Sequence, residues 1–421
     1  MGKSRMWRIA VLCMLASGMC ATAYARFDLI DHTARATGRG GAFVATADDG
    51  GAFYYNPAGL TKIEGNLVQG DLLAAFRSTK YESPTGAGSE ISQTILLPNM
   101  YVAFDPGVEK WKWGVGAFMP FGSSTDWGDT GPLRYAATYT QLKTWVINPA
   151  VAYQANENLS VGFGFDMYTG SVTSRKNLNY GAVVPGAADG KYELLSDDAY
   201  GTGYNLGMLL KTTEKSRVGI SYRSRFALMF KGQATITNKP VPPYASSSET
   251  TSAKAQYNFP DVFMIGTAYD VSEKLNVGFD FQWTNWSEFS GYQLDFDPNT
   301  ASFADQWVEK NYHDSFLYKL GSEYKLNETN FLRFGAAYSS EAMPATTISP
   351  PNSFDPSNPS NRRYSGYVGW GYRKDKFRLD LVLGVTKYAD RNVSNGPAAE
   401  RANGTYETIM PQAGIGLGWA F

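Results

Sequence analysis

The sequence predicts an all-β fold, a 14-stranded antiparallel transmembrane β-barrel with an N-terminal plug, or hatch, in its lumen. Two observations carry this prediction. Runs of alternating apolar and polar residues recur along most of the chain, and the links between successive runs are alternately short and long. Successive side chains of a strand point to opposite faces, so each run has one apolar and one polar face. Tight turns at one end and long loops at the other are the layout of outer-membrane barrels.

The composition agrees with this fold. Aromatic residues make up 14% of the 421 residues, charged residues only 18%, and glycine occurs 43 times. This mixture favours a β protein with aromatic belts over a soluble helical enzyme. Beyond residue 25 no apolar run reaches the 18 residues that a membrane helix needs. The mean hydropathy of −0.30 is compatible with a membrane barrel, because alternating faces cancel in the average.

Residues 1–25 are expected to be a cleaved secretory signal peptide. A basic start, an apolar core and a small-x-small cleavage site follow one another in Lys3–Arg8, Ile9–Ala16 and Ala23–Ala25. The alternative is a lipoprotein acylated at Cys20, but Met19 stands before it, where a small residue is expected.

Cleavage after residue 25 would remove both cysteines, Cys13 and Cys20, and with them any disulfide or Cys-metal site. It would leave 35 basic against 39 acidic residues, a net charge of −4, which argues against a nucleic-acid partner.

Residues 26–62 are predicted to form the plug, and residues 63–421 the barrel. The plug segment is rich in Gly and Ala, lacks the two-residue alternation, and ends in Asn56-Pro57-Ala58-Gly59-Leu60. A barrel of 14 strands leaves a sizeable hole if empty, because barrel diameter grows with strand number. For Asn56 and Pro57 a plain turn closing the plug is the alternative to a functional role, since both are common turn residues.

The barrel strands are predicted in order. Leu275–Trp283 is the cleanest run, with Leu, Val, Phe, Phe and Trp on one face and Asn, Gly, Asp and Gln on the other. The 14 runs are about 66–78, 95–105, 111–121, 141–154, 158–171, 200–213, 216–237, 254–271, 274–287, 312–326, 329–340, 362–374, 376–390 and 405–421. The long outer links are expected at about 79–94, 122–140, 172–199, 238–253, 288–311, 341–361 and 391–404.

The last run ends in Phe421 on an apolar face. A terminal aromatic on an amphipathic last strand resembles the signal by which outer-membrane barrels are recognised, so the barrel-assembly machinery is an expected partner. A hydrophobic terminal strand without that role is the alternative.

Alternation also sorts side chains between lumen and membrane. Charged side chains expected in the lumen, mainly as a salt-bridged lining, are Asp166, Arg223, Asp280, Lys319, Glu323, Arg333, Arg378 and Asp380. The alternative is that one of the basic residues among them meets the carboxylate of a ligand. Aromatic side chains expected in the two interface girdles are Trp111, Trp113, Trp145, Trp283, Trp286, Tyr269 and Tyr388.

Several stretches together resemble one family. Asn56-Pro57-Ala58-Gly59-Leu60, which follows Ala45–Asp49, is similar to the hatch motif of long-chain fatty acid transporters of the FadL type, a family that also contains toluene and xylene uptake channels. Further similar stretches are Pro120–Gly122, Ile147–Tyr153, Arg217–Arg223, Leu320–Tyr324 and Leu332–Gly335.

The resemblance implies uptake of hydrophobic molecules such as fatty acids or aromatic hydrocarbons. They would be captured in an outer groove, expected from loops 172–199 and 238–253, pass a mobile plug, and leave sideways where the third strand is kinked. The substrate path is expected at Phe27, Leu29, Ile30, Asn56, Pro57, Ala58, Phe118, Pro120, Phe121 and Gly122. For Pro120 the alternative is that it ends the third strand at an outer loop.

The resulting hypothesis is an outer-membrane channel in contact with the lipid bilayer and lipopolysaccharide, expected to be a monomer without metal or cofactor. The alternatives are a barrel enzyme of the lipase or protease type, and a general porin or structural barrel. An enzyme needs an acid–base group near the rim, yet only His32 and His313 exist and no GxSxG or HExxH motif occurs.

Overall fold

The computed structural model describes residues 32–182, 185–241, 245–343, 356, 359, 361–394 and 402–421. Three residues of the predicted substrate path, Phe27, Leu29 and Ile30, lie outside the described residues, as does the predicted signal peptide. The boundaries of the signal peptide and of the plug stay predictions.

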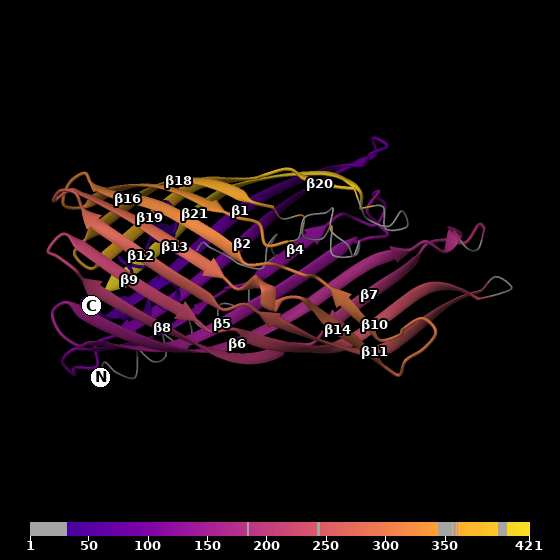
Figure 1. Cartoon of the computed structure of the whole chain (residues 1–421), viewed down its shortest axis with the longest axis horizontal. Helices are drawn as coiled ribbons and strands as arrows, with labels where there is room; N and C mark the ends of the chain where they lie inside the picture. The colour runs from indigo at the N-terminus through magenta and orange to yellow at the C-terminus, as the bar shows by residue number, and fades with distance from the viewer. Residues whose placement is uncertain are drawn as a thin grey trace.

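The strands form one closed antiparallel sheet (Figure 1). Closure occurs where β1 (Leu67–Glu82) pairs with both β2 (Gly88–Phe104) and β21 (Gly404–Ala420), the first strand with the last. The sheet has 21 segments among the described residues, and they make up 14 barrel strands because seven strands are each broken in two. The predicted fold class and strand number are therefore confirmed.

The other unbroken strands are β5 (Tyr139–Gln154), β6 (Leu159–Leu178), β17 (Asn330–Ser339) and β18 (Arg363–Lys374). The broken strands, in order, are β3 (Trp111–Phe118) with β4 (Gly122–Asp126), β7 (Gly190–Ser196) with β8 (Ala199–Lys211), β9 (Ser216–Arg223) with β10 (Phe226–Val241), β11 (Ala245–Phe259) with β12 (Val262–Asp270), β13 (Leu275–Thr284) with β14 (Gly291–Asp297), β15 (Gln306–Glu309) with β16 (Ser315–Lys325), and β19 (Phe377–Tyr388) with β20 (Arg391–Val393).

The outer links are shorter than predicted. β1 continues to Glu82 and β2 begins at Gly88, whereas a link over 79–94 was expected. Likewise β10 reaches Val241 and β11 begins at Ala245. These extensions project from one end of the barrel, on the right of Figure 1. They escaped prediction because a strand that has left the membrane has water on its outer face, so it needs no apolar face and shows no alternation.

The membrane section follows the expected alternation. On β13 the side chain of Phe279 is 45% exposed on the outside, while its neighbour Asp280 is only 1% exposed, inside. The girdle prediction is wrong for two residues, Trp286 and Tyr388, because both are buried inside the barrel. Trp286 lies in η4 (Trp286–Glu288), which turns inward between β13 and β14. Tyr388 stands an even number of residues after the inward-facing Asp380 on the same strand, so strict alternation places it inward.

The N-terminal segment, residues 32–62, lies against the inward-facing residues of the barrel. We call it the inner segment. It contains the short helices α2 (Ala34–Gly38), α3 (Ala52–Tyr55) and η2 (Pro57–Lys62). The remaining helix, η3 (Tyr180–Ala182), lies in an outer link. No helix of the described part of the chain is long and apolar enough to cross a membrane.

The inner segment approaches the wall at inward-facing glycines. Neighbouring strands carry them at nearly the same height, and we call them the glycine ring: Gly162, Gly207, Gly219, Gly266, Gly278, Gly321 and Gly335. A β-carbon on Gly335 would stand 1.9 Å from the backbone nitrogen of Gly40, and one on Gly162 would stand 2.4 Å from that of Ala58. The inner segment therefore packs backbone against backbone.

We expect Gly335→Leu to prevent this packing. The added side chain overlaps the backbone of Gly40, which has no flexible end to move aside, so the inner segment must shift away from β17. The expected result is a higher ion conductance in planar bilayers and a lower thermal unfolding midpoint. Gly366→Leu on β18 is the matched control, because nothing lies within 4 Å of its added β-carbon. Equal conductance of the two variants would contradict the prediction.

Candidate functional site

The third barrel strand is broken at Met119–Phe121, between β3 and β4. β2 pairs with β3 only from Met100 to Phe104, and β4 pairs with β5 alone, so no ladder pair joins β2 to β4 in the described structure. We call this interruption the ladder break. Pro120 has no N–H to donate to a ladder. Because the strand resumes at Gly122, Pro120 does not end it at an outer loop, and the expected kink is present.

The inner side of the ladder break is apolar and closed. Met119 is completely buried, in one cluster with Ile95 and Leu97 of β2. Phe118, also completely buried, contacts rings of the inner segment: its centroid lies 5.5 Å from that of His32 and 5.8 Å from that of Tyr54. Phe118, Pro120, Phe121 and Gly122, predicted from the sequence for the substrate path, lie at the ladder break, and Met119, which was not predicted, stands between two of them.

Farther from the inner segment, six aromatic side chains from four elements and two strand breaks meet across the lumen. We call them the aromatic layer: Phe121, Tyr168, Phe226, Phe259, Trp286 and Tyr312. Phe226 is stacked between two rings, with centroids 3.5 Å from Tyr168 and 4.6 Å from Phe259 and nearly parallel planes. Each aromatic pair contributes about 0.5–1.5 kcal/mol beyond the area it buries.

Strand breaks create this layer. Phe226 begins β10, Phe259 ends β11 and Trp286 begins η4, each within two residues of a break in its strand. In an unbroken strand, an inward-facing aromatic side chain extends into the lumen only by its own length. At a break the backbone itself can bend inward, which brings the ring farther into the lumen.

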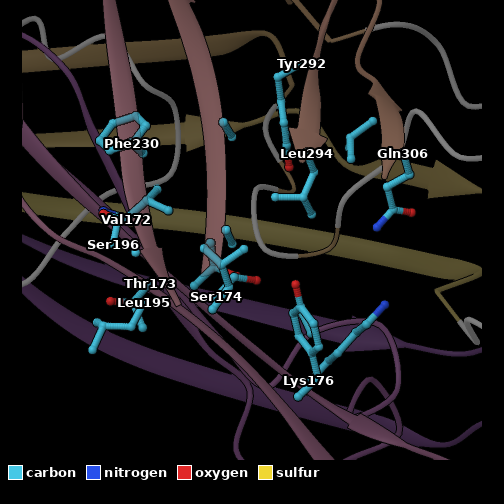
Figure 2. A pocket seen from close by; sticks show the side chains of 18 of the residues that line it. Val172, Thr173, Ser174, Lys176, Leu195, Ser196, Phe230, Tyr292, Leu294 and Gln306 are labelled. Carbon is cyan, nitrogen blue, oxygen red and sulfur yellow. The ribbon is translucent and has the colours of Figure 1, made fainter. Parts of the chain in front are cut away.

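Beyond the aromatic layer lies a cavity of about 780 Å³ (Figure 2). In Figure 2 Val172 and Phe230 lie on one side of it and Tyr292, Leu294 and Gln306 on the other. Its walls come from residues 172–178, 192–196 and 230–239, among others. The loops expected to form the outer groove, 172–199 and 238–253, thus supply part of this cavity, largely as strand extensions. Lys239, in the lining, is paired with Glu249 at 2.5 Å.

The cavity and the ladder break are joined by one apolar cluster. It contains Phe230 and Leu228 near the cavity, most of the aromatic layer, Phe118 and Phe121 at the ladder break, and Tyr54 and Tyr55 of the inner segment. A ligand that moved from the cavity to the ladder break would thus meet apolar side chains along its way.

Inward-facing carboxylates hold the backbone of the inner segment. Asp280 accepts hydrogen bonds from the backbone N–H groups of Phe43, at 2.7 Å, and Val44, at 2.9 Å. Asp71 accepts one from Ala34 at 2.8 Å. A segment with so little regular structure has many backbone groups without internal partners, and these side chains satisfy some of them.

A buried ionic network adds to these bonds. Arg333, on β17, donates to Glu323 and to Asp380, each at 2.6 Å. Arg35 of the inner segment bonds the same Glu323 at 3.2 Å and also bonds Asp48. The network therefore ties the inner segment to three barrel strands.

Five of the eight charges predicted in the lumen, Asp166, Arg223, Glu323, Arg333 and Asp380, are in ion pairs. Arg223 bonds Asp166 at 2.5 Å and also donates to the backbone oxygen of Phe53 at 2.8 Å. Lys319 donates to Gln282 at 2.9 Å. Arg378 is only partly buried and stands opposite Gly418 of β21, near the C-terminal Phe421. In the part of the chain that the structure describes, no group of His, Cys, Asp and Glu side chains is arranged to hold a metal ion.

Asn56, Pro57 and Ala58 are buried in the barrel and form a turn, which is what the alternative of a turn without a functional role predicted. The side chain of Asn56 accepts a hydrogen bond from the N–H of Ala58 at 3.1 Å and donates to the backbone oxygens of Val44 and Met208, both at 2.9 Å. This turn therefore fixes the inner segment to β8. Its place in a substrate path stays a prediction.

A closed barrel of 14 strands with an outward apolar face, an occupied lumen and an apolar route to a broken strand defines an outer-membrane transport channel. The model of the family described as outer membrane protein transport protein (OMPP1/FadL/TodX) matches residues 14–405, and the chain belongs to this family. It is accordingly an outer-membrane transport protein of the fatty acid and hydrocarbon transporter family, not an enzyme.

Relatives and solved structures agree. The chain is 25% identical over 329 residues to a long-chain fatty acid transport protein of Salmonella typhi, covering 72% of this chain and 74% of the relative. The Escherichia coli K12 protein of the same name is 24% identical, with 72% and 75% covered. A FadL homologue of Pseudomonas aeruginosa, 17% identical, has a TM-score of 0.80 over 94% of this chain and 100% of the other. The toluene transporter TodX of P. putida, 18% identical, has a TM-score of 0.75 over 94% and 99%.

We expect Arg333→Met to destabilise the protein by about 3–5 kcal/mol, because it leaves Asp380 buried without its cation and weakens the hold on Glu323. The measurement is the unfolding midpoint in detergent. Arg225→Met is the matched control: its pair with Glu288 is exposed, and removing it should cost no more than about 1 kcal/mol. A similar loss in both variants would contradict a stabilising role of the network.

Proposed function

We propose that this protein takes up hydrophobic molecules through the outer membrane. They are captured in the outer cavity, pass the aromatic layer beside the inner segment, which acts as a mobile plug, and leave sideways through the ladder break. The observation that carries the proposal is the continuous apolar cluster that links the cavity to the ladder break. The predicted cleaved signal, residues 1–25, and the plug boundary at residue 62 are part of this proposal.

Capture rests on burial of apolar surface. The cavity offers Val172, Phe230, Tyr292 and Leu294 to a ligand, and each methylene removed from water contributes about 0.8 kcal/mol. A ligand with a long hydrocarbon chain can therefore be held without any charged contact.

Passage requires the rings to move. Phe118, His32 and Tyr54 fill the way between the aromatic layer and the ladder break, and their contacts with one another are mostly ring contacts. Such contacts are exchanged for contacts with an apolar ligand at little cost, because both bury similar surface. The backbone beside these rings is also held, since Asp71 accepts from the N–H of Ala34 and Arg223 donates to the oxygen of Phe53, so passage displaces the inner segment as well as its rings.

Lateral release needs a place where the wall opens without breaking hydrogen bonds. The ladder break supplies it, since β2 and β4 are not joined by ladder bonds there. Met119 is unbranched and can change its rotamer readily, which suits a side chain that must move aside. Phe27, Leu29 and Ile30 remain predicted contacts of the ligand.

The names of the relatives support the ligand class. The Salmonella typhi relative is named for long-chain fatty acid transport, and the P. putida structure is titled a toluene transporter. Saturable uptake of labelled oleate or toluene by cells that carry this protein, above that of cells without it, would support the proposal. Passage of small polar solutes with no uptake of either ligand would favour the porin alternative.

We expect a cross-link between the inner segment and the wall to stop uptake. Gly38 of α2 and Gly369 of β18 are in contact: a β-carbon on either would lie within 3.2 Å of the other's α-carbon. The mature chain is predicted to have no cysteine of its own, so Gly38→Cys with Gly369→Cys would give one defined disulfide. Oxidation should reduce uptake strongly and a reducing agent should restore it.

The two single cysteine variants are the controls for this experiment, because they bear the same substitutions without the bond. Undiminished uptake by the oxidised double variant, with the disulfide shown to be complete, would mean that this part of the inner segment need not move.

A further inference from the structure

Arg77 occupies an unusual position at the ladder break. It lies on β1, faces inward and is 1% exposed. Its Nη2 donates to the backbone oxygen of Ser124 at 2.7 Å and to the hydroxyl of Thr125 at 3.0 Å, both on β4, and also to Gln93 of β2. One nitrogen of one side chain thus connects β1, β2 and β4 across the place where ladder bonds are missing.

Among the residues that the structure describes, Arg77 has no carboxylate partner for its charge. Its bonds go to neutral oxygens only, and its Nε and Nη1 are buried without any hydrogen-bond acceptor. Two other buried arginines of the barrel wall differ: Arg223 is paired with Asp166, and Arg333 with Glu323 and Asp380. A buried cation is costly unless an anion and hydrogen bonds compensate for its lost hydration.

Its height along the wall is defined by the strand registers. The last pair between β2 and β3 is Met100 with Ala117, and Arg77 stands opposite Gln93 of β2. Seven residues of β2 separate the two levels, roughly 23 Å of strand. Arg77 therefore marks the end of the ladder break that is nearer the outer loops. Met119 and Phe118 mark the opposite end, nearer the inner segment.

We propose that Arg77 is a binding site for the anionic head group, a carboxylate, of an amphiphilic ligand that leaves through the ladder break. This rests on the proposed function and adds to it a site that the apolar route does not require. The free N–H groups of Nε and Nη1 are the donors, and the carboxylate supplies the missing counter-charge.

The site also orients the ligand. A head group at Arg77 lies toward the outer end of the break, so the hydrocarbon tail extends toward Met119 and the membrane core. This is the orientation of a lipid in the outer leaflet, with its polar group at the outer surface. Because Arg77 also holds Ser124 and Thr125, a carboxylate that draws the guanidinium away loosens β4.

The test compares two ligands that differ only in the head group, oleate and oleyl alcohol, on the purified full-length protein and in cells. Arg77→Met removes the guanidinium and its charge and keeps an unbranched apolar side chain that extends as far as Nε. We expect it to weaken oleate binding about tenfold or more while oleyl alcohol binding changes less than about twofold, since a hydrogen bond to a charged group is lost for one ligand only. Arg77→Lys should restore part of the oleate affinity.

The outcomes separate the site from the function. Equal loss of both ligands in Arg77→Met, or no loss of either, would overturn the head-group site, because a residue that only holds β4 affects both ligands alike. Failure of the unaltered protein to bind or take up either ligand would instead overturn the carrier function. Arg225→Met, which removes an exposed cation paired with Glu288, controls for the net charge.

Discussion

The structure depends on how the lumen of a 14-stranded barrel is filled. Inward-facing side chains alone do not fill a barrel of this size, and the inner segment occupies the remaining space. Its backbone is mostly irregular, so many of its polar groups need partners from the wall. Asp280 and Asp71 accept its N–H groups, while Asn205 and Arg223 donate to the oxygen of Phe53. The glycine ring allows the close approach that these bonds require. These polar side chains of the barrel wall therefore bind the backbone of the inner segment.

This arrangement divides the lumen into two parts with different chemistry. The part that holds the inner segment is polar and ionic, with Arg35, Glu323 and Arg333 in one network. The part beyond it is aromatic, because several strands break at a common height and bring rings such as Phe226 and Trp286 inward. The apolar cluster of the second part extends to Phe118 and Phe121 at the ladder break and also includes Tyr54 and Tyr55 of the inner segment.

The sequence allowed the number of strands, their order and the lumen charges to be predicted, because the membrane forces strict alternation on every strand that crosses it. It did not allow strand length to be predicted, since β10 and β11 leave the membrane and then lose their apolar face. Trp286 was placed in a girdle because alternation fails at a break. The glycine ring has a signal in the sequence, because Gly219, Gly321 and Gly335 lie in stretches that resemble the family. Met119 and Arg77 could not be predicted, because their roles follow from β4 bending away from β2, which no local pattern encodes.

The location of the ladder break follows from how neighbouring strands break. From β9 to β16 the barrel strands are interrupted at matching heights, so each half finds a partner half: β9 pairs with β12, β10 with β11, β12 with β13, and β11 with β14. The wall bends there and stays joined. Beside the break between β3 and β4, β2 runs through unbroken and stays paired with β1 from Gly88 to Ala103. β5, on the other side, is also unbroken, and it keeps its pairs with both β3 and β4. The ladder is therefore open on the β2 side of the proline-containing break, between β2 and β4. Met119 and Arg77 then close that place with side chains, which move far more easily than a ladder separates.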